Sequence, residues 1–264
     1  MPQPGVPIDD RRSSAATMTD TIRYFDQVAG GWTDKYRHSG HFRRRLETVL
    51  SWVDRVPATY SILDFGCGSG VMMQALLARG FAVTGVDASA DMIQSARRTL
   101  RAANLTAGYE LESVSANQYD GTYLGAVYHG VICLGVLEYV EAASRLLATL
   151  ARVMAPGGFL ILSVPNQTSL LRKLEMFVHR HPRLFRGIPM LKPFTEADSY
   201  LNFQRRQFTL RWLDREATAL GLKLEAVEYQ VSPAGLQAFE GHAWVGMTML
   251  VKYRKAPVPN AAAS

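Results

Sequence analysis

The chain has 264 residues, 48% of them hydrophobic, which is enough apolar material for an extensive buried core. No apolar run reaches the about eighteen residues of a membrane-spanning helix, and the N-terminal segment lacks the apolar stretch of a signal peptide. With only Cys67 and Cys133 a disulfide framework is excluded, and a cytoplasmic location is expected. The formal net charge of +6 allows nucleic acid, a membrane surface or an acidic small molecule as partner.

The two ends of the chain differ in composition from the rest. Residues 1–20 and 256–264 are small, polar or proline-rich, so we expect flexible tails on a single domain of residues 21–255. Apolar residues near helical spacing predict helices in residues 21–57, which either cover a ligand or simply pack on the sheet. These apolar residues are Phe25, Ala29, Trp32 and Tyr36.

Strand and helix patterns alternate through the middle of the chain. The expected strands are residues 60–65, 81–86, 109–113, 126–134 and 159–164, and the expected helices are 70–79, the segment after Ser89, and 141–154. Residues 156–158, Pro-Gly-Gly, are expected to form a turn. Such alternation predicts an α/β fold with a parallel sheet and helices on both faces.

The regular alternation of strands and helices ends after residue 164. An irregular insert at 167–207 is followed by a helix at 209–220 and by two strands, 223–229 and 244–253. The short connection between these strands allows an antiparallel pair.

Residues 61–89 read SILDFGCGSGVMMQALLARGFAVTGVDAS, with glycines at alternate positions 66, 68 and 70. In an open parallel sheet a ligand binds beyond the carboxyl ends of the strands, where glycines let the backbone approach it closely. Asp87 ends the next strand, where its carboxylate could accept both hydroxyls of a ribose. The spacing lacks the gap of the dinucleotide fingerprint and the Lys-Ser/Thr of a phosphate loop. A nucleoside without a pyrophosphate therefore fits better.

Four motifs together resemble those of the class I S-adenosylmethionine-dependent methyltransferases. They are ILDFGCGSG (62–70), VTGVDAS (83–89), GVICLGVLEYV (130–140) and RVMAPGGFLILSVPN (152–166), and the resemblance covers roughly residues 24–253. It implies a Rossmann-like, seven-stranded, mostly parallel sheet with an antiparallel last strand, and S-adenosyl-L-methionine as cofactor. The overall pattern is similar to small-molecule O-methyltransferases of quinone, tetrapyrrole and secondary-metabolite biosynthesis.

The resemblance also implies where the cofactor binds. The residues expected at its methionine part are Asp64, Gly66, Cys67, Gly68 and Gly70, those at its ribose and adenine are Asp87, Ala88, Met92, Ser115, Ala116 and Asn117, and those near its amino end and methyl group are Leu134 and Gly135. Residues 115–117 lack the acidic residue often found in the family. Neither Cys67 nor Cys133 is expected to act as a nucleophile, and both are expected to be packing residues.

The N-terminal helical segment is expected to complete the cofactor site. Tyr24 and Trp32 would shield the sulfonium side, and Arg43 or Arg44 would meet the methionine carboxylate. The planar guanidinium of arginine suits a carboxylate.

The insert carries the clue to the acceptor. One helical stripe is apolar, namely Leu170, Leu171, Leu174, Phe177 and Val178, while Arg172, Lys173 and Arg180 lie elsewhere. This pattern is typical of a lid over a lipophilic acceptor that could rest on anionic lipid, or of an ordinary packed helix. We expect Leu174 and Phe177 to touch the acceptor.

Methyl transfer needs positioning more than it needs a base. If the acceptor is a hydroxyl, the candidate bases are His179, His181 and Tyr139, with His242 and Glu138 as further candidates by position. No metal site is expected, because His179 and His181 lack further ligands.

Three classes of function remain open. A methyltransferase of a small, lipophilic acceptor leads, preferentially at oxygen, with nitrogen or carbon as alternatives. An RNA or protein methyltransferase is second, disfavoured because residues 134–137 read Leu-Gly-Val-Leu where amino-methylating nucleic-acid enzymes resemble one another in an Asp/Asn-Pro-Pro-aromatic motif. A non-catalytic nucleotide-binding protein is third. The sequence makes no prediction about oligomeric state.

Overall fold

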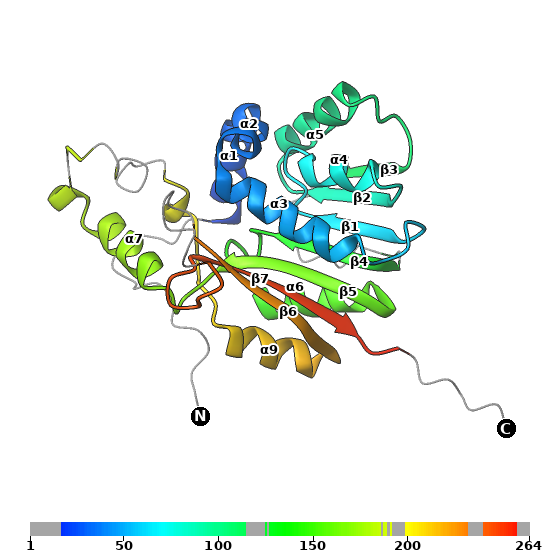
Figure 1. Cartoon of the computed structure of the whole chain (residues 1–264). Coiled ribbons are helices and arrows are strands. Elements are labelled where there is room, and N and C mark those ends of the chain that lie inside the picture. The colour runs from blue at the N-terminus through cyan, green and yellow to red at the C-terminus, as the bar shows by residue number, and fades with distance from the viewer. Residues whose placement is uncertain are drawn as a thin grey trace.

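A computed structural model describes residues 17–114, 125, 127–185, 187–188, 191, 199–231 and 240–257. Over these residues the chain forms a sheet in the order β3-β2-β1-β4-β5-β7-β6 (Figure 1). The strands are β1 (Ser61–Phe65), β2 (Ala82–Asp87), β3 (Tyr109–Ser113), β4 (Tyr128–Leu134), β5 (Met154–Pro165), β6 (Leu222–Gln230) and β7 (Thr248–Lys255). Strands β1 to β5 pair in parallel, whereas β7 runs antiparallel to both β5 and β6. The predicted mostly parallel sheet with an antiparallel last strand is confirmed.

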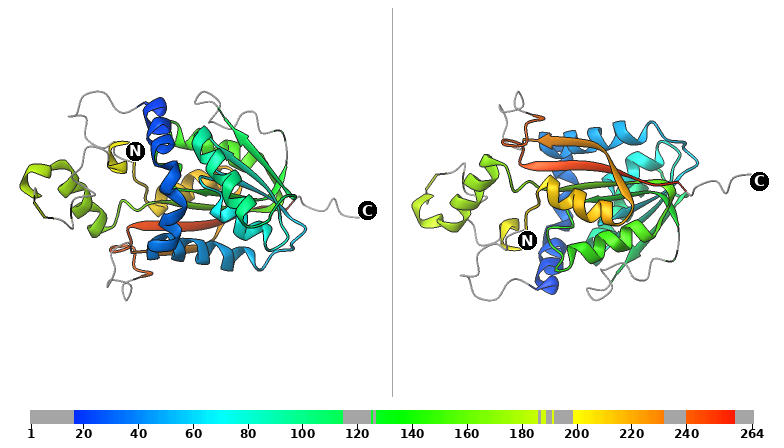
Figure 2. Two further views of the ribbon diagram at one scale, coloured as in Figure 1. Left: turned by 90° about the horizontal axis from the view of Figure 1, so that it is seen from above. Right: turned by 90° about the horizontal axis from the view of Figure 1, so that it is seen from below.

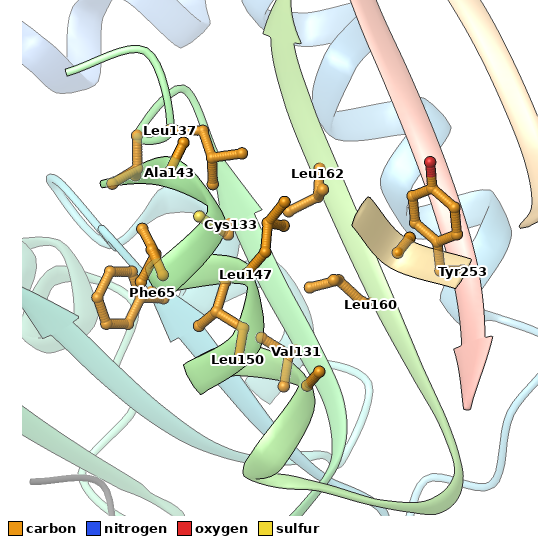
Figure 3. Close-up of a cluster of buried hydrophobic side chains, with 14 of the residues drawn as sticks. Phe65, Val131, Cys133, Leu137, Ala143, Leu147, Leu150, Leu160, Leu162 and Tyr253 are labelled. Atoms are coloured by element: carbon orange, nitrogen blue, oxygen red, sulfur yellow. The ribbon is translucent and has the colours of Figure 1, made fainter. Parts of the chain in front are cut away.

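Helices cover both faces of this sheet, as predicted. On one face α3 (Gly40–Val53), α4 (Val71–Leu77) and α5 (Ala90–Ala102) pack over a core that includes Val49 and Met73. On the other, α6 (Ala143–Arg152) and α9 (Leu210–Ala219) close a second core around Phe65, Leu147 and Leu160 (Figure 3). Because both faces are covered, ligands have access mainly at the strand ends.

The N-terminal helices lie near the carboxyl ends of the first strands. They are α1 (Met18–Val28), the short 3-10 turn η1 (Ala29–Gly31) and α2 (Trp32–His38), which leads into α3. Thr17 and Asp20 form a reciprocal capping box, which satisfies backbone N–H groups at the start of α1. The helix thus begins at Met18, inside the segment expected to be a tail, while residues 1–16 and 258–264 lie outside the described part of the chain.

Two expectations for the last strands are wrong in detail. The Pro-Gly-Gly at 156–158 is part of β5 rather than a turn, and the register against β4 shifts between Tyr128 and Gly130. Gly157 has a φ of +74°, so the proline and glycines are absorbed by a bulge in one long strand. Strand β7 begins at Thr248 instead of residue 244, because backbone bonds from Val245 and Gly246 to the His242 carbonyl close a turn before it.

The insert is built around α7 (Leu170–Arg180), followed by η3 (Pro182–Phe185) and later η5 (Tyr200–Asn202). Figures 1 and 2 show α7 at the end of the molecule away from the C-terminus, beyond the carboxyl ends of the parallel strands. Within the described segments, no helix is long and apolar enough to cross a membrane.

Candidate active site

The glycine-rich loop connects β1 to α4. The N–H groups of Gly66 and Cys67 donate to the carbonyl of Val86 at 2.7 and 3.0 Å, which ties the loop to the end of β2. Gly68 has a φ of +54°, and a Cβ at this position would lie 3.4 Å from the indole nitrogen of Trp32. The backbone can therefore take this path because glycine accepts a positive φ without strain, and the Trp32 indole lies against it.

Asp87 is held in place at the end of β2. Its Oδ2 accepts from the Gly68 N–H and its Oδ1 from the Ser89 N–H, both at 2.9 Å. Burial raises the pKa of Asp87 to about 6, against the lowering effect of these backbone bonds. Each carboxylate oxygen keeps a second lone pair, so the side chain can still accept two further hydrogen bonds from a ligand.

The cover helix α1 is fastened to the same region. The Ser89 hydroxyl donates to Asp26 of α1 at 2.6 Å, while it also accepts from the Met92 N–H as the N-cap of α5. This hydrogen bond therefore holds helix α1 against the turn that follows β2.

A cavity of about 940 Å³ runs from this turn to the insert. It brings together most of the predicted site residues, namely Trp32, Asp64, Gly66, Cys67, Gly68, Asp87, Ala88, Met92, Leu134, Gly135 and Tyr139. These residues come from the ends of β1, β2 and β4 and from α2 and α5. One end of the cavity is therefore the glycine loop and the other lies beneath α7.

Asp64 and Arg45 place opposite charges in the middle of the cavity. Asp64 is 2% exposed, and its Oδ2 has no hydrogen-bond partner among the described residues. Burial and the nearby Asp87 raise the pKa of Asp64 to about 7, with Arg45 acting in the opposite direction. Arg45 donates to the Tyr36 hydroxyl, and its guanidinium carbon lies 4.6 Å from the centre of the Phe42 ring. A buried carboxyl group and a buried guanidinium that line the same cavity suit a ligand that carries an ammonium and a carboxylate.

Some of the predicted cofactor residues do not line the cavity, among them Arg44, which instead forms an ion pair with Glu240 at 2.6 Å. Arg43 is exposed, whereas Arg45, two residues on, points inward. Tyr24 stacks on Phe203 with ring centres 4.6 Å apart, and its neighbour Phe25 faces the cavity instead.

Gly70 does not line the cavity either. A Cβ there would lie 2.9 Å from the Cβ of Ala96, so Gly70 serves the packing of α4 on α5 rather than ligand contact. The predicted residues Ser115, Ala116 and Asn117 lie outside the described residues.

The predicted histidines also lie away from the cavity. His179 and His181 are at the end of α7, where the His181 ring packs 4.7 Å from that of Phe177. His242 is exposed, and its ring nitrogen lies 3.3 Å from the Glu240 carbonyl oxygen. The histidine that does line the cavity is His41, and burial lowers its pKa to about 3, so its ring is neutral at pH 7.

Of the apolar stripe expected to face the acceptor, Leu171, Leu174 and Val178 line the cavity, and the charged residues Arg172 and Glu175 line it beside them. In α7, Arg172 and Glu175 are buried and form an ion pair, while Leu170, Leu174 and Phe177 are 56%, 56% and 48% exposed. The Tyr200 hydroxyl donates to Glu175 at 2.8 Å, and Arg172 donates to the Met247 carbonyl at 3.2 Å. Leu174 still reaches the cavity edge, as expected, but Phe177 does not.

Sequence reasoning therefore missed His41, Arg45, Arg172, Glu175 and Tyr200. Opposite charges three residues apart on α7 were the one available signal, because such a pair opposite an apolar stripe can be buried. Among the described residues, no group of three or more His, Cys, Asp or Glu side chains is placed to hold a metal ion.

Comparison with known proteins defines the class. A family model described as a methyltransferase domain matches residues 35–226, and the chain belongs to this family. The resemblance to class I S-adenosylmethionine-dependent methyltransferases is thereby confirmed.

The relatives with similar sequences include ubiquinone biosynthesis O-methyltransferases. The chain is 32% identical over 210 residues to the mitochondrial ubiquinone biosynthesis O-methyltransferase of Schizosaccharomyces pombe, covering 76% of this chain and 75% of that protein. It is also 32% identical over 150 residues to the ubiquinone biosynthesis O-methyltransferase of Thiobacillus denitrificans, covering 56% of this chain and only 63% of the relative.

The fold is also similar to that of a solved structure, the magnesium protoporphyrin IX methyltransferase of Synechocystis PCC 6803 with bound SAH. The TM-score is 0.66 at 17% identity, and the match covers 90% of this chain and 99% of that one. At this identity the likeness concerns the fold alone.

Proposed function

We propose that this protein transfers the methyl group of S-adenosylmethionine to an oxygen atom of a small, lipophilic acceptor. The observation that carries this proposal is the single cavity that joins the glycine loop and Asp87 to a compartment beneath α7. The relatives whose names specify O-methyl transfer in ubiquinone biosynthesis favour oxygen over nitrogen or carbon. We also propose a single domain of residues 21–255, with residues 21–57 as a cover and 167–207 as a lid.

The residues present fit this cofactor. Asp87 would hold the ribose hydroxyls, and the buried Oδ2 of Asp64 would accept from the methionine ammonium. Arg45 would meet the carboxylate, in the role expected of Arg43. Gly66 and Gly68 leave the backbone open for close approach.

The cofactor, when bound, supplies a methyl group on a sulfonium leaving group. The work of the chain is then to hold the acceptor oxygen in line and to exclude water. Leu171, Val178 and Phe185 supply apolar walls at the lid end, which suits a lipophilic acceptor better than RNA or a protein side chain.

This function is tested with purified protein, tritium-labelled S-adenosylmethionine and octyl gallate, a lipophilic phenol. We expect tight binding of S-adenosylhomocysteine by calorimetry and transfer of label to octyl gallate, identified as an O-methyl ether by mass spectrometry. Labelled RNA or protein in place of the phenol product would support the second class of function. A folded protein without affinity for S-adenosylhomocysteine would contradict the proposal entirely.

We further propose that the lid rests on an anionic membrane surface. The support is a set of exposed apolar side chains on α7 and after it, namely Leu170, Phe177, Leu184 and Ile188. Lys173, Arg180 and Arg183 lie among them and are exposed as well. Apolar side chains flanked by cations are typical of surfaces that bind the interface of anionic bilayers.

Flotation with vesicles tests the membrane contact. The protein should float with phosphatidylglycerol vesicles and less with phosphatidylcholine, and Phe177→Ser with Leu184→Ser should abolish this. Val127→Ser is the matched control, because Val127 is 61% exposed but lies just before β4, at the opposite strand ends. Equal flotation of both variants would rule the lid out as the contact.

A further inference from the structure

Glu138 is a buried carboxyl group in the wall of the cavity, and one of its oxygens has no hydrogen-bond partner among the described residues. It lies in the turn directly after β4, is 5% exposed, and lines the cavity. Its Oε2 is fully buried and has no hydrogen-bond partner among the described residues. A buried carboxyl oxygen without a partner loses its hydration at a cost that a bound ligand can recover.

The position of Glu138 is fixed from two sides. Its carbonyl accepts from the Arg205 N–H at 2.8 Å, which ties the turn to the end of the insert. Its Oε1 and the guanidinium of Arg45 both lie near Gly135, at 3.7 and 3.5 Å from the position of a Cβ there. The backbone of Glu138 is therefore anchored to the insert, and its carboxyl group lies beside the end of β4.

This place lies between the two compartments of the cavity. The positive charges that act on Glu138 are Arg45 of α3, at the proposed methionine end, and Arg172 of α7, at the lid. The charges of Glu138 and of Asp64 on β1 both raise the pKa of the Cys133 thiol, after the larger effect of burial. An acceptor oxygen placed between cofactor and lid would therefore lie near the carboxyl group of Glu138.

We propose that Glu138 is the catalytic residue that takes the proton from the acceptor hydroxyl. The assignment rests on the proposed O-methyl transfer. In the step, a lone pair of the acceptor oxygen forms the new O–CH₃ bond and the electrons of the S–CH₃ bond go to sulfur. The O–H proton passes to Oε2, and water removes it from Glu138 after the product leaves.

The other titratable groups at the cavity are less suited to this task. Burial, followed by the charge of Glu138, raises the pKa of the Tyr139 hydroxyl well above its ordinary value, so Tyr139 stays protonated. His41 is a weak base, because burial lowers its pKa to about 3. Burial raises the pKa of Glu138 itself to about 7, which matches the operating range of a general base.

The test compares Glu138→Gln, which keeps the shape and loses the base, with Glu138→Asp, which keeps the carboxylate. Glu141→Gln is the matched control, because the Glu141 side chain is 75% exposed and only three residues away. With octyl gallate at pH 8, Glu138→Gln should lose about a hundredfold or more in kcat, the range of general bases, and Glu138→Asp should recover part of it. S-adenosylhomocysteine affinity should stay within about threefold in all variants.

A second readout is independent of turnover. Infrared titration of the S-adenosylhomocysteine complex should show a carboxyl band that titrates near the pKa of about 7 of Glu138 and that is missing in Glu138→Gln. If no band is lost in the variant, or if kcat falls less than about tenfold with octyl gallate, the assignment is overturned.

Two further outcomes separate this assignment from the proposed function. Loss of S-adenosylhomocysteine binding in Glu138→Gln would make Glu138 a cofactor ligand and overturn its role as base. If the wild type binds S-adenosylhomocysteine but does not methylate octyl gallate, the acceptor class is contradicted, and the infrared titration alone decides on Glu138.

Discussion

Asp87 is the single residue through which the cofactor assignment is most directly tested. Its carboxylate accepts the Gly68 and Ser89 N–H groups and is proposed to accept the ribose hydroxyls as well. Asp87→Ala should weaken S-adenosylhomocysteine binding by roughly 2–4 kcal/mol in calorimetry, the scale of lost charge-assisted hydrogen bonds. NAD should bind neither protein.

A thermal melt serves as control, because the variant also leaves two backbone N–H groups without their acceptor. A folded Asp87→Ala protein with unchanged affinity would remove Asp87 from the site.

Gly70 shows how a residue of a ligand-binding motif can have a packing role. It combines a φ of +75° with a Cβ position 2.9 Å from Ala96, so Gly70→Ala adds both backbone strain and steric overlap. We expect this substitution to lower the free energy of unfolding by about 3 kcal/mol in urea denaturation.

Gly157→Ala separates the two effects. Gly157 has a φ of +74° but no atom within 4 Å of the added Cβ, so the variant measures strain alone, about 1 kcal/mol. If both variants lose the same free energy of unfolding, the steric overlap with Ala96 does not destabilise the protein.

At the scale of elements, α7 presents two different surfaces. Leu171 lines the cavity, whereas Phe177 points outward and packs on His181 and Phe185. Leu171→Ser should therefore raise the KM for octyl gallate by about tenfold, the effect of losing part of a buried leucine, without changing S-adenosylhomocysteine affinity.

Phe177→Ser is the control and should leave the KM near the wild-type value in the absence of vesicles. An increase in KM for Phe177→Ser that equals the effect of Leu171→Ser would mean that the acceptor contacts Phe177, as the sequence predicts.

The secondary-structure predictions are accurate where short-range sequence patterns determine the element. Strands β1 and β2 and helix α5 lie within a few residues of their expected positions, because apolar periodicity and the Ser89 cap are local signals. Residues 159–164 of β5 were predicted, but its start at Met154 was missed, since a Pro-Gly-Gly sequence is typical of a turn. It lies in a bulge between Met154, which pairs with Tyr128 of β4, and Phe159, where pairing with both β4 and β7 continues.

At the scale of the whole molecule, the buried carboxyl groups make stability depend on pH. Burial raises the pKa of Asp64 to about 7, so between its unfolded value near 4 and 7 the folded protein holds a proton that the unfolded chain has lost. The contribution of Asp64 is thus present at low pH and falls as pH rises through this window. Asp64→Asn should melt at a temperature further above that of the wild type at pH 8 than at pH 5.5.

The comparison with the variant is needed because His41 acts in the opposite direction. Its lowered pKa of about 3 makes stability rise with pH between 3 and its ordinary value of 6.5, and this effect cancels between two proteins that both contain His41. A constant difference in melting temperature across pH would show that Asp64 titrates normally.

The sequence by itself determined the order of strands and helices, the glycine loop and the position of Asp87. Each of these follows from short-range signals: apolar periodicity, glycines at a strand end, and an acid after the next strand. The class of protein follows from the same four motifs, and the family match confirms it.

Only the tertiary structure decided which arginine points inward, which face of α7 lines the cavity, and that Glu138 is buried with a free oxygen. These outcomes depend on partners far away in the chain, because a charged side chain can be buried only where another segment satisfies it. Arg172 is accepted inside because Tyr200, 28 residues away, and the Met247 carbonyl, 75 residues away, hydrogen-bond to it. No local pattern in α7 encodes those contacts, so the apolar stripe predicted Leu171, Leu174 and Val178 at the cavity but not the buried Arg172 and Glu175 beside them.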